Sequence, residues 1–202
     1  MDKIGVFVID PAWPQKKGGL RETRKNQGRN LDYRTMSVND IFDLLDNDIF
    51  PLAQTDHCVF MWTIEKFLLS CEEEMIRRGY KRHCRMIWDK MNGVAPAFTV
   101  RFTHEYLIWY YKGRLPDISV KQRGKFPTVF REYGRQHSRK PEFSYQMIET
   151  LYPDCIKMDM FSREYREGWL QYGDQLDFFN RNSQINDNSN CNAHNKSHQI
   201  SF

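Results

Sequence analysis

The chain has 202 residues, of which 40% are hydrophobic and 14% aromatic, and it carries a formal net charge of +4. This length suits one well-packed domain plus a tail and is too short for two comfortable domains. No apolar run approaches the ~20 residues that a membrane span needs, and no signal-peptide pattern opens the chain. We therefore predict a cytoplasmic protein without a membrane segment, and nuclear residence stays open.

The five cysteines indicate a reducing compartment. They are odd in number, widely scattered and without a Cys-x-x-Cys pair. Such spacing is typical of free thiols rather than of a disulfide framework or a zinc centre. We predict buried, reduced thiols and no metal requirement.

The first predicted element is Ile4 to Ile9, a run of mostly β-branched or aromatic residues that ends at Asp10. Such a run predicts a strand buried on both faces. A carboxylate then stands at the carboxyl end of a core strand, where open α/β sheets bind their ligands. Pro11 stiffens the following turn, and Trp13 offers a flat aromatic face. An ordinary Asp-Pro turn is the alternative interpretation.

This strand end suits a conjugated exocyclic amine such as N6 of adenine. Because the lone pair of that nitrogen is delocalised into the ring, two acceptors must take its hydrogens before it acts as a nucleophile. The Asp10 carboxylate and the Pro11 carbonyl are candidates for these acceptors, and Trp13 is a candidate for clamping the ring. We predict that these three residues are catalytic.

Two long segments are rich in basic residues. From Gln15 to Met36 there are seven Lys or Arg residues against two acids, and from Lys112 to Lys140 there are nine against two. Basic segments that flank a sheet indicate a polyanionic partner, and solvated surface loops are the alternative. We predict that the segments face each other as two jaws that hold nucleic-acid phosphates. The candidate substrate-binding residues are Lys16, Lys17, Arg21, Arg24, Lys121, Arg123 and Lys125.

The remaining patterns predict helices that alternate with strands. Ser37 and Asp40 form a capping pair for a helix to about Asn47, and Gly79 ends a second helix over 65–78. Pro141 occupies the first position of a third helix. This order predicts an α/β fold with a mostly parallel sheet flanked by helices. Further strands are predicted at 57–63, 84–90, 104–112, 154–161 and 176–179, the last one after a turn through 168–173.

The composition changes abruptly at Asn180. Residues 180–202 are mostly Asn, Ser, His and Gln, with almost no apolar content. Such a segment cannot bury enough apolar surface to offset the entropy of ordering. We predict one domain over 1–179 and a disordered tail over 180–202.

Five short motifs occur in the order and spacing of a known family. Residues 10–13 resemble its catalytic Asp-Pro-Pro-Trp, and Ile-Trp-Asp-Lys at 87–90 and His-Glu-Tyr-Leu at 104–107 resemble its middle strands. His-Ser-Arg-Lys-Pro at 137–141 resembles its His-Ser-x-Lys-Pro turn, and 158–163 resemble its Glu-Leu-Phe-x-Arg strand end. This is the MT-A family of N6-adenine methyltransferases, named for the 70-kilodalton subunit of the mRNA adenosine methyltransferase. The resemblance covers most of the chain.

The resemblance implies a Rossmann-like class I methyltransferase fold with permuted motif order, in which the catalytic strand precedes the cofactor strand. It also implies S-adenosylmethionine as the methyl donor. Lys140 stands at a helix start, where its charge and the free N–H groups suit the carboxylate of the cofactor, and a solvated lysine is the alternative. The cofactor-binding residues implied by the resemblance are Asp10, Lys140, Asp159, Phe161, Arg163, Asp174 and Gln175.

Asp159 is costly to bury without donors, so we expect it to accept hydrogen bonds from the cofactor or to form a structural ion pair with Arg163. Asp174 and Gln175 occupy a position that, in the resemblance, contacts the cofactor ribose. Phe161 walls the same pocket or packs in the core. For Trp169 we favour the core.

The sequence also departs from the family pattern. Ala12 replaces the second proline, which removes turn rigidity but neither acceptor nor aromatic ring. Tyr165 and Arg166 stand where some members have His-Asn, which leaves one cofactor contact in doubt. The chain begins nine residues before Asp10, so the upstream segment that contacts the cofactor adenine in larger relatives is absent or replaced.

Together these features predict an S-adenosylmethionine-dependent enzyme that methylates N6 of adenine in nucleic acid. We favour DNA over RNA because the chain is compact and shows no accessory recognition domain, as in small phage or bacterial relatives of the family. A catalytically silent, nucleic-acid-binding partner subunit is the main alternative, although retention of Asp10 and Trp13 argues against it. Methylation of RNA adenosine or of cytosine N4 is a further alternative. A homodimer or a heterodimer is compatible with the resemblance.

Overall fold

The computed structural model describes residues 3–14, 33–91, 100–136, 138–176 and 178–179. Four of the candidate phosphate-binding residues, Lys16, Lys17, Arg21 and Arg24, and the predicted tail lie outside these ranges. Among the described residues, no helix is long and apolar enough to cross a membrane. The same ranges contain no group of three or more His, Cys, Asp or Glu residues that could hold a metal ion.

Seven strands form one sheet: β1 (Ile4–Ile9), β2 (Ala53–Thr63), β3 (Lys81–Asp89), β4 (His104–Lys112), β5 (Val129–Arg131), β6 (Lys157–Met160) and β7 (Trp169–Tyr172). Their order across the sheet is β5-β3-β4-β2-β1-β6-β7. Six strands run in the same direction, whereas β4 is antiparallel to its neighbours β2 and β3. The sheet is therefore mostly parallel, as predicted, and the strand that ends at Asp10 comes first in the chain.

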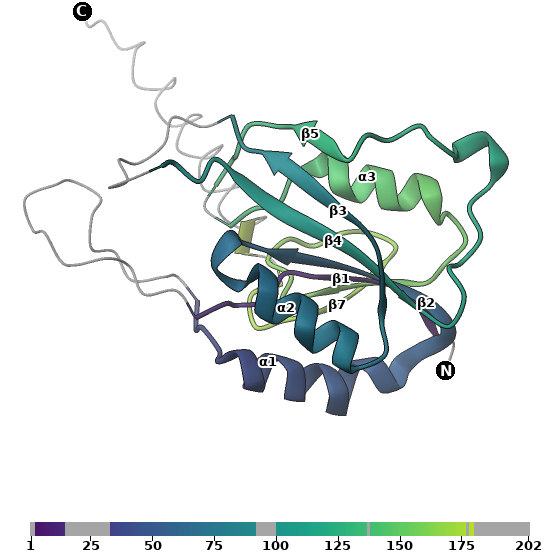
Figure 1. Cartoon of the computed structure of the whole chain (residues 1–202), viewed down its shortest axis with the longest axis horizontal. Helices are drawn as coiled ribbons and strands as arrows, with labels where there is room; N and C mark the ends of the chain where they lie inside the picture. The colour runs from purple at the N-terminus through teal and green to yellow at the C-terminus, as the bar shows by residue number, and fades with distance from the viewer. Residues whose placement is uncertain (1–2, 15–32, 92–99, 137, 177, 180–202) are drawn as a thin grey trace, which may run out of the picture.

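Helices cover both faces of this sheet. Helices α1 (Val38–Leu44) and α2 (Glu65–Arg77) lie on one face, and α3 (Glu142–Leu151) lies on the other (Figure 1). The predicted capping pair is confirmed, because the Ser37 hydroxyl accepts from the Asp40 N–H at 3.1 Å and the Asp40 carboxylate accepts from the Ser37 N–H at 3.3 Å. After α1 the chain continues as a π-helical turn, Leu45–Ile49, and a 3-10 turn, Phe50–Leu52.

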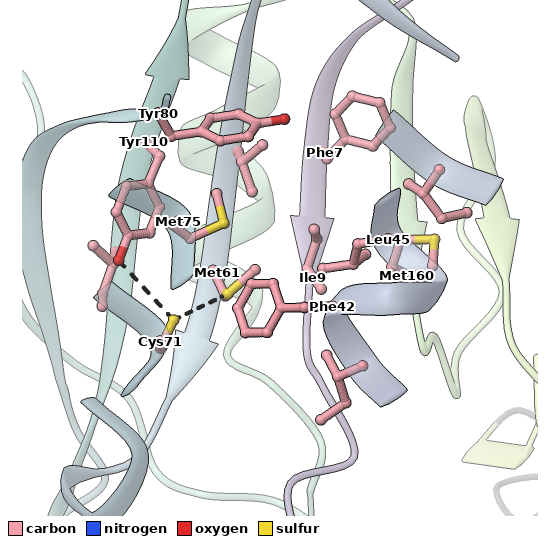
Figure 2. Packing of buried hydrophobic residues seen from close by; sticks show 14 of the residues in the cluster. Phe7, Ile9, Phe42, Leu45, Met61, Cys71, Met75, Tyr80, Tyr110 and Met160 are labelled. Carbon is pink, nitrogen blue, oxygen red and sulfur yellow. Dashed lines mark hydrogen bonds between the residues drawn. The ribbon is translucent and has the colours of Figure 1, made fainter. Parts of the chain in front are cut away.

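Strand β1 is buried along its entire length because both faces of the sheet are covered. Phe7 and Ile9 pack toward α1 and α2, among Phe42, Met61 and Met75 (Figure 2). The alternate residues of β1 pack toward α3. This two-sided burial explains why the strand reads as a continuous apolar run rather than as an alternating pattern.

The prediction of buried thiols is confirmed for two of the four cysteines that the structure describes, and the other two are half-buried. Cys58, Cys71, Cys84 and Cys155 are free thiols, the first two fully buried. Figure 2 shows the Cys71 thiol between the Met61 sulfur, at 3.1 Å, and the Tyr110 hydroxyl, at 4.0 Å. Burial raises the pKa of Cys71 to about 12, so this thiol stays protonated.

Two predicted elements differ from the structure. The last strand is Trp169–Tyr172, where a turn was expected, and the described residues 176, 178 and 179 are not in a strand. Gly168 and Gly173, which suggested a turn, instead stand on either side of this short strand. Trp169 lies in the core, as expected. Strand β5 was not predicted, because its three residues are too few to show a periodicity.

Candidate active site

A cavity of about 810 Å³ opens where the parallel strands of the sheet end. Asp10 follows β1, Thr63 ends β2 and Lys90 follows β3, so the parallel strands bring these residues to one edge. Glu105 reaches the same edge because it lies near the start of the antiparallel strand β4. The other walls come from the segment before α3 and from the turns after β6 and β7, with Ser138, Arg139, Lys140, Phe161, Arg163, Tyr172 and Asp174 among the lining residues.

A network of two carboxylates and two ammonium groups forms the floor of this cavity. The Lys140 ammonium lies 2.9 Å from Oδ1 of Asp10 and 2.9 Å from Oε2 of Glu105. Lys90 donates to the other oxygen of Glu105. Two negative charges thus face two positive charges, which is the condition for keeping charged groups inside a protein.

The electrostatics of this network are set by burial and by the two lysines. Burial raises the pKa of Asp10, and the Lys140 ammonium opposes the rise. Burial acts on Glu105 in the same direction, but Lys140 and Lys90 outweigh it and lower the pKa of Glu105 to about 2. The pKa of Lys140 lies above its ordinary value because its two carboxylate partners outweigh burial. Asp10 is therefore the carboxylate of this pair that is more readily protonated.

Pro11 and Trp13 complete the turn after β1. The Pro11 carbonyl accepts a hydrogen bond from the Trp13 N–H at 2.7 Å, so one of its two lone pairs is in use. Trp13 lines the cavity but is only 3% exposed. Its ring stacks on Phe67 at 5.2 Å and its indole N–H donates to the Trp62 carbonyl at 3.1 Å. One face of the indole is therefore already covered by protein.

The cavity wall after β6 contains a strained residue. Phe161 has a φ of 61°, which a bulky side chain rarely adopts. Its N–H donates to the Tyr172 carbonyl at 2.7 Å, and a Cβ at Gly173 would lie 3.0 Å from the Ser162 carbonyl oxygen. The close approach of these two turns thus requires glycine at 173. Backbone strain of this kind persists where the surroundings hold it and is common at functional sites.

Asp159 lies under the cavity floor, 3% exposed. Its carboxylate accepts from the Tyr145 hydroxyl at 3.1 Å. Burial raises the pKa of Asp159 to about 7, and hydrogen bonds from Tyr145 and Ser162 only partly offset this. A water-sized space of about 20 Å³ separates Asp159 from Asp10.

The comparisons with known proteins agree with this geometry. The family model described as MT-A70 matches residues 4–175. The chain belongs to the MT-A70 family. It is 29% identical over 182 residues to the N(6)-adenosine-methyltransferase MT-A70-like protein of Arabidopsis thaliana. The aligned region covers 86% of this chain and 24% of that protein.

Two further relatives differ in length. The catalytic subunit METTL3 of Homo sapiens is 24% identical over 184 residues, covering 88% of this chain and 29% of that protein. The Type II methyltransferase M.MunI of Mycoplasma sp is 24% identical over 187 residues, covering 85% of this chain and 77% of that protein. The chain thus spans about a quarter of the length of the relatives named for adenosine methylation.

The MT-A70 match supplies the methyl donor of the family, S-adenosylmethionine, and the cavity contains groups that fit it. Asp174 offers a carboxylate for hydroxyl groups and Phe161 an apolar surface, both within the cavity wall. The volume of about 810 Å³ falls in the range of small-molecule and cofactor sites. The residues present are therefore compatible with a nucleoside-containing cofactor.

Lys140 was expected at the start of a helix with free N–H groups that bind the cofactor carboxylate, and the structure differs from this expectation. Helix α3 begins at Glu142, one residue later than expected, and its first N–H groups are not free. The Glu132 carboxylate accepts from the N–H of Glu142 at 2.9 Å and of Phe143 at 3.0 Å. The Lys140 ammonium itself lies between Asp10 and Glu105. Its place in this MT-A70 site is beside the carboxylate at the end of β1.

Other predicted cofactor residues lie around the cavity rather than all within its wall. Arg163 lines the cavity, donates to the Gln175 side chain at 2.8 Å and stacks on Phe178 at 4.0 Å. Gln175 thereby holds Arg163, whereas its neighbour Asp174 faces the cavity. The guanidinium group of Arg166 pairs with Glu142, at 2.6 Å for the closest atoms.

The sequence interpretation missed two members of the charged network, Glu105 and Lys90. Both stand inside motifs that were recognised, but only as strand residues. The signal was present, because Glu105 directly precedes the apolar run of β4 and a carboxylate buried there needs a partner. The direction of β4, which brings Glu105 to Asp10, was not readable from its residues.

The second basic jaw is placed differently from the prediction. Residues 134–136 and 138–140 at its end do line the cavity. Lys121, Arg123 and Lys125 instead follow β4, which leaves the cavity edge and ends beside the start of β2, at the opposite end of the sheet (Figure 1). None of the three lines the cavity, and the first basic segment lies largely outside the described residues. The antiparallel direction of β4 is the cause of this correction.

Proposed function

We propose that this protein transfers a methyl group from S-adenosylmethionine to N6 of adenine in nucleic acid. The observation that carries the proposal is the Asp10 carboxylate, which lies at the strand-end cavity beside the Pro11 carbonyl and 2.9 Å from Lys140. A carboxylate has about four acceptor positions, so Lys140 leaves others for an amine. Family membership supports the reaction class.

In the proposed reaction, the protein aligns the amine and accepts its hydrogens. S-adenosylmethionine supplies, when bound, a methyl group on a positively charged sulfur. Asp10 accepts one hydrogen of the amine and the second lone pair of the Pro11 carbonyl accepts the other, which directs the nitrogen lone pair at the methyl carbon. As the N–C bond forms and the C–S bond breaks, the nitrogen loses one proton to Asp10. Lys140 keeps Asp10 ionised until that step.

The cofactor assignments remain part of the proposal. We propose that Asp174 accepts from the ribose hydroxyls, that Phe161 packs against the adenine and that Arg163, oriented by Gln175, contacts the same nucleoside. Asp159 supports the site from below through Tyr145. Trp13 is only 3% exposed and stacks on Phe67, so it supports the turn after β1 instead of clamping the target base as expected.

DNA is the preferred substrate in this proposal, with RNA as the alternative. The preference is supported by one comparison. The match covers 77% of the Type II methyltransferase M.MunI, whereas it covers 29% of the METTL3 catalytic subunit.

The deciding experiment is methylation of matched DNA and RNA with cofactor carrying a labelled methyl group, followed by digestion to nucleosides and mass spectrometry. We expect labelled N6-methyladenine with the wild type and none with Asp10→Ala. Label on cytosine N4 would contradict the choice of base. Calorimetry with the cofactor tests the silent-partner alternative, because absence of heat at millimolar cofactor in the wild type would contradict catalysis.

A further inference from the structure

The segment that connects β4 to β5 presents cations from an ordered scaffold. Three of its side chains, Leu115, Ile118 and Phe126, pack against the core on the α3 side. Its 3-10 turn, Val120–Gln122, is closed by a hydrogen bond from the Gln122 N–H to the Ser119 carbonyl at 2.8 Å. The segment is therefore anchored at both ends of the turn, and the positions of its cations follow from the fold.

The charge of this segment is concentrated. Residues 112–125 contain five cations and one acid, Asp117, for a net charge of +4, equal to that of the entire chain. All five cations are exposed. Asp56 pairs with Arg114 at 3.0 Å. We call this surface the basic end, defined by Lys112, Arg114, Lys121, Arg123 and Lys125.

The basic end begins far from the cavity, at Lys112, and none of its five cations lines the cavity. Thr63 lines the cavity, and His57 pairs with Lys112 in the sheet. Six residues of β2 separate Thr63 from His57, which is roughly 20 Å at about 3.3 Å per residue. Duplex DNA rises about 3.4 Å per base pair, so this distance corresponds to about six base pairs.

We propose that the basic end is a second binding surface for the phosphate backbone of the nucleic acid whose target base occupies the cavity. This inference rests on the proposed function and adds a length requirement to it. Five exposed cations on one ordered segment attract a polyanion without reading its sequence. A strand that reaches both places must extend at least about six base pairs beyond the target. Shorter substrates contact only the cavity.

The test varies substrate length and the charge of the basic end. Duplexes carry one adenine that the wild type methylates, flanked by about four or about twelve base pairs on each side. For Lys121→Gln/Lys125→Gln we expect a KM at least about fivefold above wild type on the long duplex, and unchanged on the short one. We expect kcat to be unchanged on both. The charge-retaining control Lys121→Arg/Lys125→Arg should match wild type, and Asp117→Asn should lower the KM on the long duplex.

Salt dependence gives a second measurement that does not require turnover. Fluorescence anisotropy with the long duplex should show the slope of log affinity against log salt falling by about 2 in the Gln double variant, because each lost phosphate contact contributes about 0.9. An unchanged slope and KM would overturn the inference. Equal effects on long and short duplexes would also overturn it. If wild type methylates nothing but the slope changes, the proposed function fails and the binding surface stands.

Discussion

The Lys140 ammonium contacts the Asp10 carboxylate at 2.9 Å inside the protein, so the charge state of the proposed catalytic acid depends on a lysine from a distant part of the chain. Burial raises the pKa of Asp10 and the nearby Glu105 carboxylate adds to the rise, whereas Lys140 is the largest opposing influence. The pair explains why the segment before α3 belongs to the site. It also fixes how the site should respond to substitution.

Removing this lysine should suppress activity through the charge of Asp10. Lys140→Met leaves two buried carboxylates without their shared partner, which we expect to destabilise the fold by about 3–5 kcal/mol. The pKa of Asp10 then rises further, so the pH at which the rate increases moves upward and activity at pH 7 falls roughly tenfold for each unit that this pKa lies above 7. The pH–rate profile and urea unfolding measure the two effects. A profile with the wild-type midpoint would exclude this role.

Asp159 should make the protein less stable as the pH rises toward neutrality. Its pKa is about 7 in the folded state and near 3.8 when unfolded, because burial disfavours the carboxylate. Between these values the folded state binds the extra proton, so the free energy of unfolding falls as pH increases. Asp159→Asn should therefore raise Tm at pH 7.5 relative to wild type and change it little at pH 4. An exposed control, Asp43→Asn, should leave the pH dependence of Tm as in wild type.

Trp13 should contribute to stability through its indole N–H. In Trp13→Phe an aromatic ring can still stack on Phe67, but the Trp62 carbonyl loses its donor. An unsatisfied buried group of this kind costs about 1–3 kcal/mol. We expect the free energy of unfolding to drop by that amount, with kcat reduced less than tenfold because Asp10 and Pro11 remain. A loss of kcat comparable to that of Asp10→Ala would show that the ring takes part more directly.

Local signals in the sequence were sufficient for the elements that carry the site. The continuous apolar run of β1 reflects burial on both faces, and the Ser37 and Asp40 pair begins α1 as expected. Asp10 lies at the cavity as expected, because the carboxyl ends of parallel strands meet at one edge of the sheet. These features depend on residues that are close in the sequence, so a local sequence pattern predicts them.

Long-range partners were not predictable in the same way. Glu105 approaches Lys140 because β4 is antiparallel, and the same reversal sends Lys121 to the far end of the sheet. Nothing within β4 records its direction, because a strand buried on both faces has the same pattern either way. The start of α3 was misjudged by one residue and its N–H groups were taken as free, because the group that occupies them, Glu132, comes from a separate segment.

Glu132 should therefore act as a positioning residue for Lys140. Its carboxylate caps two N–H groups of α3, directly after the lysine that contacts Asp10. Glu132→Ala removes this cap, so we expect a loss of about 0.5–2 kcal/mol in the free energy of unfolding. Because Lys140 is then less well held beside Asp10, the pH–rate profile should shift in the same direction as in Lys140→Met, but by less. Glu132→Gln keeps an acceptor and should retain most of the stability and the wild-type profile. A lower stability with an unshifted profile in Glu132→Ala would limit Glu132 to a structural cap.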